Sequence, residues 1–131
     1  MAKYVYPAVF TPEDRGYSVV FPDLEGCYTS GDDLKDALFM ANDVLAFTLY
    51  DYEKEGRDIP VPSDSKVLKL KDDEFASYVM CDTLEYQKRN NSKAVKKTLS
   101  IPEWLNEMAT DANINFSQVL QNALKEQLHL Q

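Results

Sequence analysis

The sequence predicts an α+β protein built from two domains, and three observations lead to this prediction. Short runs rich in Val, Tyr and Phe open the chain, and a single long helical pattern follows them. A polar stretch, QKRNNSKA, then precedes a short final part with its own strand-like and helical patterns. We therefore expect a first domain over residues 1–86, a linker over 87–94 and a second domain over 95–131.

The first domain opens with three predicted strands in an antiparallel meander. Tyr4–Phe10 and Tyr17–Phe21 carry strand-forming Val, Tyr and Phe, and TPEDRG between them has the composition of a turn. PDLEG at 22–26 makes a second tight connection, and it leads into a short third strand that begins over Cys27–Thr29.

A long amphipathic helix follows the third strand. Ser30–Asp33 supplies side chains that can cap the free amides of a first turn, and the helical pattern begins at Leu34. We expect the helix to end near Glu55, because Gly56 is a favourable C-terminal stop. Its apolar residues recur at three- and four-residue spacing and predict ordinary packing against the sheet, without a functional role: Leu34, Leu38, Ala41, Leu45, Leu49 and Tyr52.

The rest of the first domain is predicted as a loop, a strand and a short helix. DIPVPSDS at 58–65 contains two prolines and predicts an extended loop, and residues 66–70 follow as a short strand or an extended segment. Residues 76–81 predict the last strand, and Asp82 then caps a short helix that runs roughly to Arg89.

Charge separates the two parts of the chain. The net charge of −8 lies within residues 1–90, which hold 18 acidic and 10 basic residues, whereas residues 91–131 hold four of each. The acidic part repels nucleic acid and suits a basic protein partner, although acidic surfaces also serve solubility alone. No apolar run is long enough to span a membrane and no signal peptide is evident, so we expect a cytoplasmic protein without a membrane partner.

The residue types argue against a metal centre or a catalytic set. Cys27 and Cys81 lie in apolar or tyrosine-rich runs and predict reduced, buried side chains. The only histidine is His129, so neither a zinc site nor a Ser-His-Asp or Cys-His set can be assembled. We expect no metal, no cofactor and no catalytic residue, and therefore a protein that is not an enzyme.

The second domain has the predicted order strand, helix, helix. VKKTLSI at 95–101 alternates as a strand, Pro102 suits the first turn of a helix, and Ser117 is the expected N-cap of a second helix. A lone strand has no partner, and two short helices cannot bury a core by themselves. If two copies pair, each strand gains a partner in a two-stranded ribbon, and the four helices of the two copies share one core. The residues expected in this dimer core are Leu99, Ile101, Leu105, Met108, Val119, Leu120 and Leu124.

A two-stranded ribbon fits the major groove of DNA, and strand alternation assigns its faces. With the apolar residues directed into the dimer core, Lys96, Thr98 and Ser100 point outward as candidates for reading base edges. Phosphate is expected to contact lysines beside the strand and the free amides that start the second helix: Lys93, Lys97, Phe116 and Ser117. The same residues could form an ordinary solvated face and an ordinary cap, and a helix–turn–helix is the main structural alternative.

Three features of the first domain follow one another along the chain: the motif FPDLEGCYTSGD at 21–32, the long helix from Leu34 and the loop IPVPS at 59–63. The motif and this order resemble the HicB antitoxins. VMCDTLEYQKR at 79–89 resembles the family's last strand and short helix. VKKTLSIPEWLNEMA and FSQVLQNALKEQL resemble the ribbon-helix-helix tail of one branch of the family, so the resemblance spans nearly the whole chain.

The resemblance implies a fold, partners and a function. The N-terminal domain would be a partial ribonuclease-H-like fold without nuclease activity, which binds a HicA-type toxin and masks the active face with which this small basic protein cleaves mRNA. The tail would bind operator DNA as a homodimer and repress its own operon, and pairing of dimers into tetramers is left open. Other ribbon tails often have Gly in the turn and Ser or Arg after the capping Ser. Here Asn115-Phe116 precedes Ser117 and Gln118 follows it, which puts the strength of the phosphate clamp in question.

The sequence does not identify the toxin contacts. Asp23, Glu25, Asp32 and Asp33 are candidates because they cluster in loops of the acidic domain. Two alternatives remain: a ligand-sensing ribbon-helix-helix repressor without a toxin partner, and a metal-dependent ribonuclease-H-like nuclease. The nuclease is disfavoured because the bodies of the three best strands carry no carboxylates, and the sensor because the four glycines form no phosphate loop.

Overall fold

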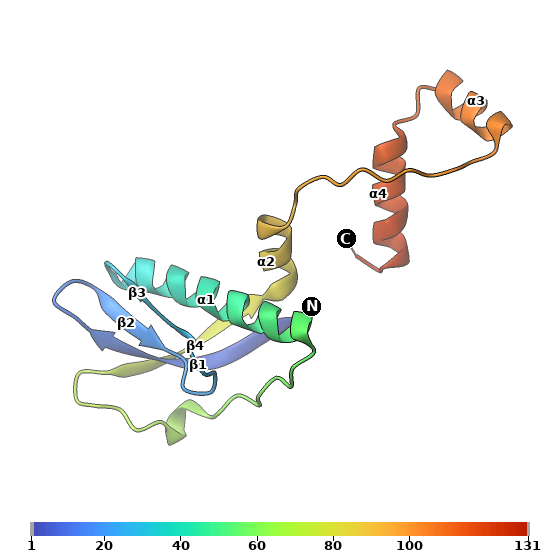
Figure 1. Cartoon of the computed structure of the whole chain (residues 1–131). Coiled ribbons are helices and arrows are strands. Elements are labelled where there is room, and N and C mark those ends of the chain that lie inside the picture. The colour runs from blue at the N-terminus through green and yellow to red at the C-terminus, as the bar shows by residue number, and fades with distance from the viewer. Residues whose placement is uncertain (1, 131) are drawn as a thin grey trace. The chain divides into compact units, whose positions relative to one another are not determined.

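The computed structural model describes residues 2–130 (Figure 1). The chain divides into two compact units, which we call unit 1, residues 1–93, and unit 2, residues 94–131. Unit 1 holds a four-stranded antiparallel sheet with helices, and unit 2 holds two helices. The prediction of a mixed α+β protein is therefore confirmed.

The sheet of unit 1 has the strand order β3-β2-β1-β4, and every neighbouring pair is antiparallel. β1 spans Lys3–Pro12, β2 spans Tyr17–Val20, β3 spans Tyr28–Gly31 and β4 spans Phe75–Asp82. The first three strands form the expected meander, and β4 pairs with the remaining edge of β1 (Figure 1).

Alternation along the strands gives the sheet one buried face and one open face. The buried face joins the long helix in a single core, to which β1 contributes Tyr6, Ala8 and Phe10. On the opposite face Val5 pairs with Met80 and Val20 pairs with Tyr28. We call this side the outer sheet face, and its exposed apolar side chains are Val5, Val20, Tyr28, Tyr78 and Met80.

The two cysteines belong to the core of unit 1, but Cys27 is not in a strand. It lies in the turn before β3, where its amide donates to the carbonyl of Leu24 and its carbonyl accepts from the amide of Phe21, so the third strand begins later than predicted. Cys27 and Cys81 are free and buried. Burial raises the pKa of the Cys27 thiol and, as the largest of several causes, raises the pKa of Cys81 to about 12. Both thiols are therefore protonated and unreactive at neutral pH.

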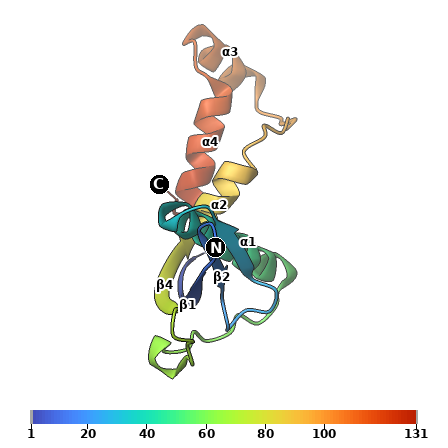
Figure 2. The same ribbon diagram turned by 90° about the vertical axis from the view of Figure 1, so that its left-hand side faces the viewer.

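Helix α1 spans Leu34–Glu55 and lies across one face of the sheet (Figure 2). Its start and end follow the expected chemistry, because the Asp33 side chain accepts from the Asp36 amide at 2.7 Å and Gly56 ends the helix with φ of 67°. The residues that it buries are Ala37, Ala41, Leu45, Ala46, Leu49 and Tyr52.

The predicted apolar stripe of α1 is wrong at its first two positions. Leu34 and Leu38 are 43% and 42% exposed, although both were expected to pack against the sheet. At this end of the helix the backbone of β3 approaches the backbone of α1 directly, because a Cβ on Gly31 would lie only 2.3 Å from the amide nitrogen of Ala37. Small residues therefore make the contact with the sheet, and the larger leucines lie beside it.

The connection from α1 to β4 is a loop anchored by long-range hydrogen bonds. The Tyr6 hydroxyl donates to the carbonyl of Pro60, and both the amide and the hydroxyl of Ser63 donate to the Asp23 carboxylate. The predicted strand or extended segment at 66–70 contains no strand; instead a single 3-10 turn, η1, spans Ser65–Val67.

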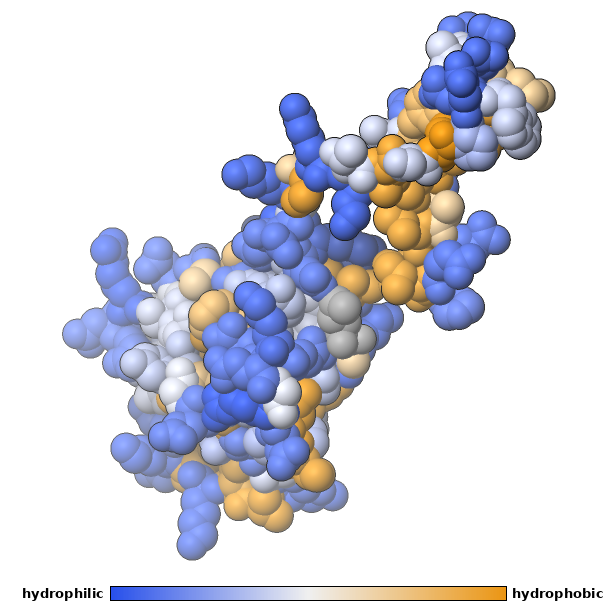
Figure 3. Space-filling model, turned by 45° about the vertical axis from the view of Figure 1, so that its right-hand side comes forward, coloured by the Kyte–Doolittle hydropathy of each residue, from blue (hydrophilic) through white to orange (hydrophobic). Residues whose placement is uncertain are grey.

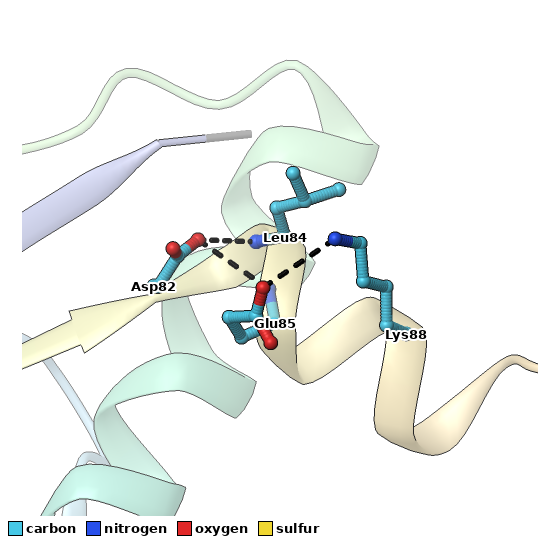
Figure 4. Close-up of polar contacts among 4 residues, drawn as sticks. All are labelled: Asp82, Leu84, Glu85 and Lys88. Atoms are coloured by element: carbon cyan, nitrogen blue, oxygen red, sulfur yellow. Dashed lines mark hydrogen bonds and ion pairs between the residues drawn. The ribbon is translucent and has the colours of Figure 1, made fainter. Parts of the chain in front are cut away.

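Helix α2 spans Thr83–Asn90 and begins directly after β4. The Asp82 carboxylate accepts from the amides of Leu84, at 2.9 Å, and Glu85, as Figure 4 shows, so the expected cap is confirmed. The helix continues through Asn90, so residues 87–90, expected in the linker, are helical.

Buried polar contacts tie the start of α2 to the rest of unit 1. The side chain of Thr83, which is fully buried, accepts from the Ala2 amide at 2.8 Å and donates to Glu53, which also accepts from the Tyr4 hydroxyl at 2.7 Å. These bonds join the first strand, the end of α1 and the start of α2, so the three elements hold each other in place.

Unit 2 contains α3, Glu103–Asp111, and α4, Phe116–Gln127. The segment 95–101, expected as a strand, forms no strand within this single chain. A strand needs a partner, and the described part of unit 2 has no second strand to supply one. The expected N-cap of α4 is also wrong: Asn115, not Ser117, caps the helix by accepting from the Gln118 amide at 3.0 Å.

Gly31→Ala should lower the free energy of unfolding of unit 1 by more than the roughly 1–3 kcal/mol typical of an overpacked core. The added Cβ would meet the amide nitrogen and Cα of Ala37 within 2.5 Å, and backbone atoms cannot turn aside. Urea unfolding followed by circular dichroism measures the change. Gly26→Ala is the control, because its Cβ meets nothing within 4 Å and only its φ of 71° costs about 1–2 kcal/mol. Equal losses in the two variants would contradict the close approach of β3 and α1.

Candidate functional site

The apolar side chains of unit 2 are not buried in the single chain. Of the seven residues expected in a dimer core, Leu120 is half-buried, and the other six are exposed: Leu99, Ile101, Leu105, Met108, Val119 and Leu124. Figure 3 shows apolar side chains gathered on the surface of this part of the molecule. Exposed apolar surface on this scale marks an interaction site, so unit 2 is incomplete as it stands.

A groove of about 500 Å³ runs between the extended segment 95–101 and α4. Leu99 and Ile101, 58% and 47% exposed, line it from the segment. Helix α4 lines it with Phe116, Val119, Leu120 and Ala123. Lys97, expected at phosphate, lies on the same side of the segment as Leu99 and also lines the groove. An apolar element of matching length would fill it.

The residues expected to read bases are accessible. Lys96, Thr98 and Ser100 are exposed, and Ser100 does not line the groove that holds Leu99 and Ile101. Lys96 and Thr98 line a second hollow together with Leu99 and with Leu120 and Leu124 of α4, so in the single chain they are not directed away from this helix as expected. Lys93, at the end of unit 1, is exposed as well.

The start of α4 presents free backbone amides. The Asn115 side chain takes the Gln118 amide, and the first helical bond runs from the Val119 amide to the Asn115 carbonyl at 3.0 Å. This leaves the amides of Phe116 and Ser117 without a hydrogen-bond partner among residues 2–130. Free amides at the positive end of a helix dipole form a seat for an anion.

Two of the four acidic residues that were expected to contact the toxin already accept hydrogen bonds within unit 1. Both carboxylate oxygens of Asp23 accept from Ser63, at 2.8 Å and 2.5 Å, and Asp33 caps α1. Glu25 and Asp32 are exposed. The loops therefore offer fewer free carboxylates than their composition suggests.

The outward side of α1 holds a set of residues that the sequence analysis did not single out. Phe39, Asp43, Phe47 and Asp51 follow one another at four-residue spacing, and we call them the α1 stripe. Phe39 and Phe47 are 61% and 49% exposed, whereas the two carboxylates are partly exposed. The four-residue spacing is visible in the sequence. The stripe was missed because the helix was assigned only to packing, on the apolar pattern of its buried side.

Helix α2 contributes an aromatic ring beside the α1 stripe. The ring of Tyr86 lies 6.3 Å from that of Phe47 and 5.7 Å from that of Tyr50. Burial raises the pKa of Tyr86, and the neighbouring carboxylates of Asp43 and Asp51 raise it further. The Tyr86 hydroxyl is therefore neutral, and the negative charge on this side of unit 1 comes from the carboxylates.

A metal site and a membrane-spanning helix are both absent from the described residues. Among residues 2–130, no group of three or more His, Cys, Asp and Glu side chains could hold a metal ion. Within the same residues, the helices are too short or too polar to cross a membrane.

Comparison with known proteins identifies the class of this chain. Residues 6–123 match the model of a family described as HicB-like antitoxins of bacterial toxin–antitoxin systems. The chain thus belongs to a class of proteins described as antitoxins of bacterial toxin–antitoxin systems, and this class indicates a non-enzymatic regulator. Within that class, it belongs to the HicB-like antitoxin family.

Individual relatives agree with this family. Antitoxin HicB 2 of Photorhabdus laumondii subsp. laumondii is 40% identical over 58 residues, which are 44% of this chain and 42% of the relative. The match thus spans less than half of the curated relative. A chain of a toxin–antitoxin complex from Streptococcus pneumoniae is 31% identical, with a TM-score of 0.64, over 95% of this chain and 99% of that chain. A chain of the HicA3 and HicB3 toxin-antitoxin complex is 25% identical, with a TM-score of 0.51, over 60% of this chain and 99% of that chain.

Proposed function

We propose that this antitoxin neutralises a HicA-type mRNA-cleaving toxin by binding it and masking its active face, and that it represses its own operon by binding operator DNA as a dimer. Unit 1 is the toxin-binding part, a partial ribonuclease-H-like domain, and unit 2 is a ribbon-helix-helix. The protein acts in the cytoplasm, by binding alone.

The observation that carries the dimer is the unpaired segment 95–101 beside an open apolar groove. In a second copy the same segment is equally unpaired, so the two can pair as antiparallel strands. Pairing brings Leu99 and Ile101 of both copies together over the four helices and removes their exposed surface from water. A symmetric pair of this kind closes on itself, because each copy supplies the element that the other lacks.

The paired strands would present Lys96, Thr98 and Ser100 on the side away from the helices. These side chains supply donors and acceptors to base edges in the major groove, whereas the free amides of Phe116 and Ser117 suit phosphate. Base contacts then give sequence preference, and phosphate contacts fix the ribbon on the duplex. This division of roles supports operator binding by unit 2.

The charge of unit 1 supports a basic partner. The net charge of −8 lies within residues 1–90, and a toxin that holds RNA must carry positive charge. The likeness to a chain of the HicA3 and HicB3 complex covers 60% of this chain, which is more than the whole of unit 2, so it must include much of unit 1. These observations favour unit 1 as the toxin-binding part.

Leu99→Asp should convert the dimer into a monomer and abolish operator binding, because a carboxylate cannot be buried in the shared core. Light scattering gives the mass, and a gel shift with operator DNA gives the binding. Ser100→Asp, on the opposite side of the same segment, should keep the dimer and weaken only DNA binding, since its charge repels phosphate. If the Leu99→Asp protein is still a dimer, the proposed pairing of the two strands is wrong.

The double change Lys96→Ala with Thr98→Ala should weaken operator binding by about tenfold or more while the dimer mass stays the same. Because a phosphate or base contact by each Lys96 is lost, the slope of log affinity against log salt should also become shallower. Fluorescence anisotropy at several salt concentrations measures both quantities. Lys54→Ala, an exposed lysine of unit 1, is the control and should change neither. Full-strength binding by the double variant would place the DNA contact elsewhere.

Truncation after Lys93 should retain toxin binding and lose operator binding. The shortened protein keeps the whole of α2 and the buried core of unit 1, so it should remain folded. Calorimetric titration with a HicA-type toxin and a gel shift with operator DNA test the two activities separately. A truncated protein that still shifts operator DNA, or that no longer binds toxin, would contradict the assignment of roles to the two units.

A further inference from the structure

The α1 stripe is an unpartnered helix face of unusual composition. A helix packed on a sheet normally turns polar residues toward water, yet here two phenylalanines project outward, 61% and 49% exposed. Asp43 and Asp51 alternate with them at four-residue spacing. Because α1 rises about 1.5 Å per residue, successive members of the stripe are separated by about 6 Å along the helix axis.

The stripe is held in a fixed geometry. It lies on a single helix of 22 residues whose other side is packed against the sheet, and Tyr86 of α2 packs beside its Phe47. No hydrogen bond or ion pair is formed by the carboxylates of Asp43 and Asp51 among residues 2–130. Two rings and two carboxylates are therefore presented together, with their polar atoms free to bind a partner.

Alternating rings and carboxylates match the chemistry of arginine. A guanidinium group can stack on an aromatic face and at the same time bond a neighbouring carboxylate with two parallel hydrogen bonds. Lysine fits the same surface less well, because its ammonium group is a point charge and has no planar face to stack on a ring. A protein surface rich in arginine and lysine thus fits the stripe better than an apolar or acidic surface does.

We propose that the α1 stripe is the docking surface for the toxin, and that it receives the cationic, RNA-binding side of that protein; this inference rests on the proposed function. Its carboxylates take the places of RNA phosphates, and its phenyl rings take the places of stacked bases. The antitoxin thereby competes with RNA for the same cations, and cleavage stops because the substrate cannot bind.

The outer sheet face is the rival surface, and it fits arginine less well than the α1 stripe does. Its exposed apolar side chains, Val5, Val20, Tyr28, Tyr78 and Met80, are not interleaved with carboxylates. The loop anchored to it, by the bond from the Ser65 amide to the Tyr78 hydroxyl at 2.9 Å, carries charges of both signs. The α1 stripe alternates rings with carboxylates, so it offers a guanidinium group stacking and hydrogen bonds at one place.

The test uses the full chain and a catalytically inactive HicA-type toxin, with affinity measured by calorimetric titration. Asp43→Asn with Asp51→Asn should weaken binding on the order of tenfold or more and make it less sensitive to salt. Asp72→Asn with Asp73→Asn is the matched control, since it removes the same charge from an exposed loop. Phe39→Ser should weaken binding similarly, and Tyr28→Ser on the outer sheet face should not.

Each outcome separates the inference from the proposed function. If the unchanged protein does not bind the toxin, the proposed function itself fails. If it binds and the two aspartate pairs lose affinity equally, the attraction is only long-range and the docking surface is elsewhere. If Tyr28→Ser weakens binding and Phe39→Ser does not, the toxin docks on the outer sheet face. Melting curves of all variants exclude loss of folding as the cause.

Discussion

The direct contact between β3 and α1 sets the geometry of unit 1. Gly31 has no Cβ, so the strand can lie against the backbone of the helix at Ala37. Ala41, one turn further along, is also small, and the larger Leu45 and Leu49 are buried beyond it. A helix held so close to its sheet leaves room only for small residues at that end, and its bulky residues must lie elsewhere. The exposure of Leu34 and Leu38, on either side of Ala37, follows from this constraint.

The two units differ in how much of their own apolar surface they bury within one chain. Unit 1 has a closed core that joins sheet and helix, and its loops are fixed by hydrogen bonds between distant residues such as Asp23 and Ser63. Unit 2 buries almost none of its leucines within one chain. Stability of unit 1 is therefore a property of the single chain, whereas that of unit 2 depends on what covers its groove. This difference agrees with a protein that uses one unit for a partner and the other for self-association and DNA.

Local chemistry was sufficient to predict the elements whose ends are set by neighbouring residues. Asp33, Gly56 and Asp82 mark helix ends as expected, because a cap acts within one turn. At α4 the expectation of Ser117 as the cap was wrong, because Asn115 is also a favourable cap residue and the helix begins directly after it.

Other features could not be read from local pattern. The exposure of Leu34 and Leu38 depends on how closely a distant strand approaches, and the use of Asp23 depends on a residue forty positions away. The segment 95–101 has the alternation of a strand, but a single chain does not provide its partner. The α1 stripe is different, because its four-residue spacing is present in the sequence; only the structure separates it from the buried side of the helix.

The junction between β4 and α2 has a mechanical consequence. Asp82 is at once the last residue of the strand and the cap of the helix, so no loop intervenes between them. Because no loop residue separates them, the direction of α2 is set by the end of β4, and Tyr86 packs beside Phe47. A surface that is already ordered before binding loses little conformational entropy when a partner protein binds to it. More of the contact energy then remains as affinity. Inserting a few glycines at this junction would make the position of Tyr86 beside Phe47 less fixed, although every residue of the surface would remain the same.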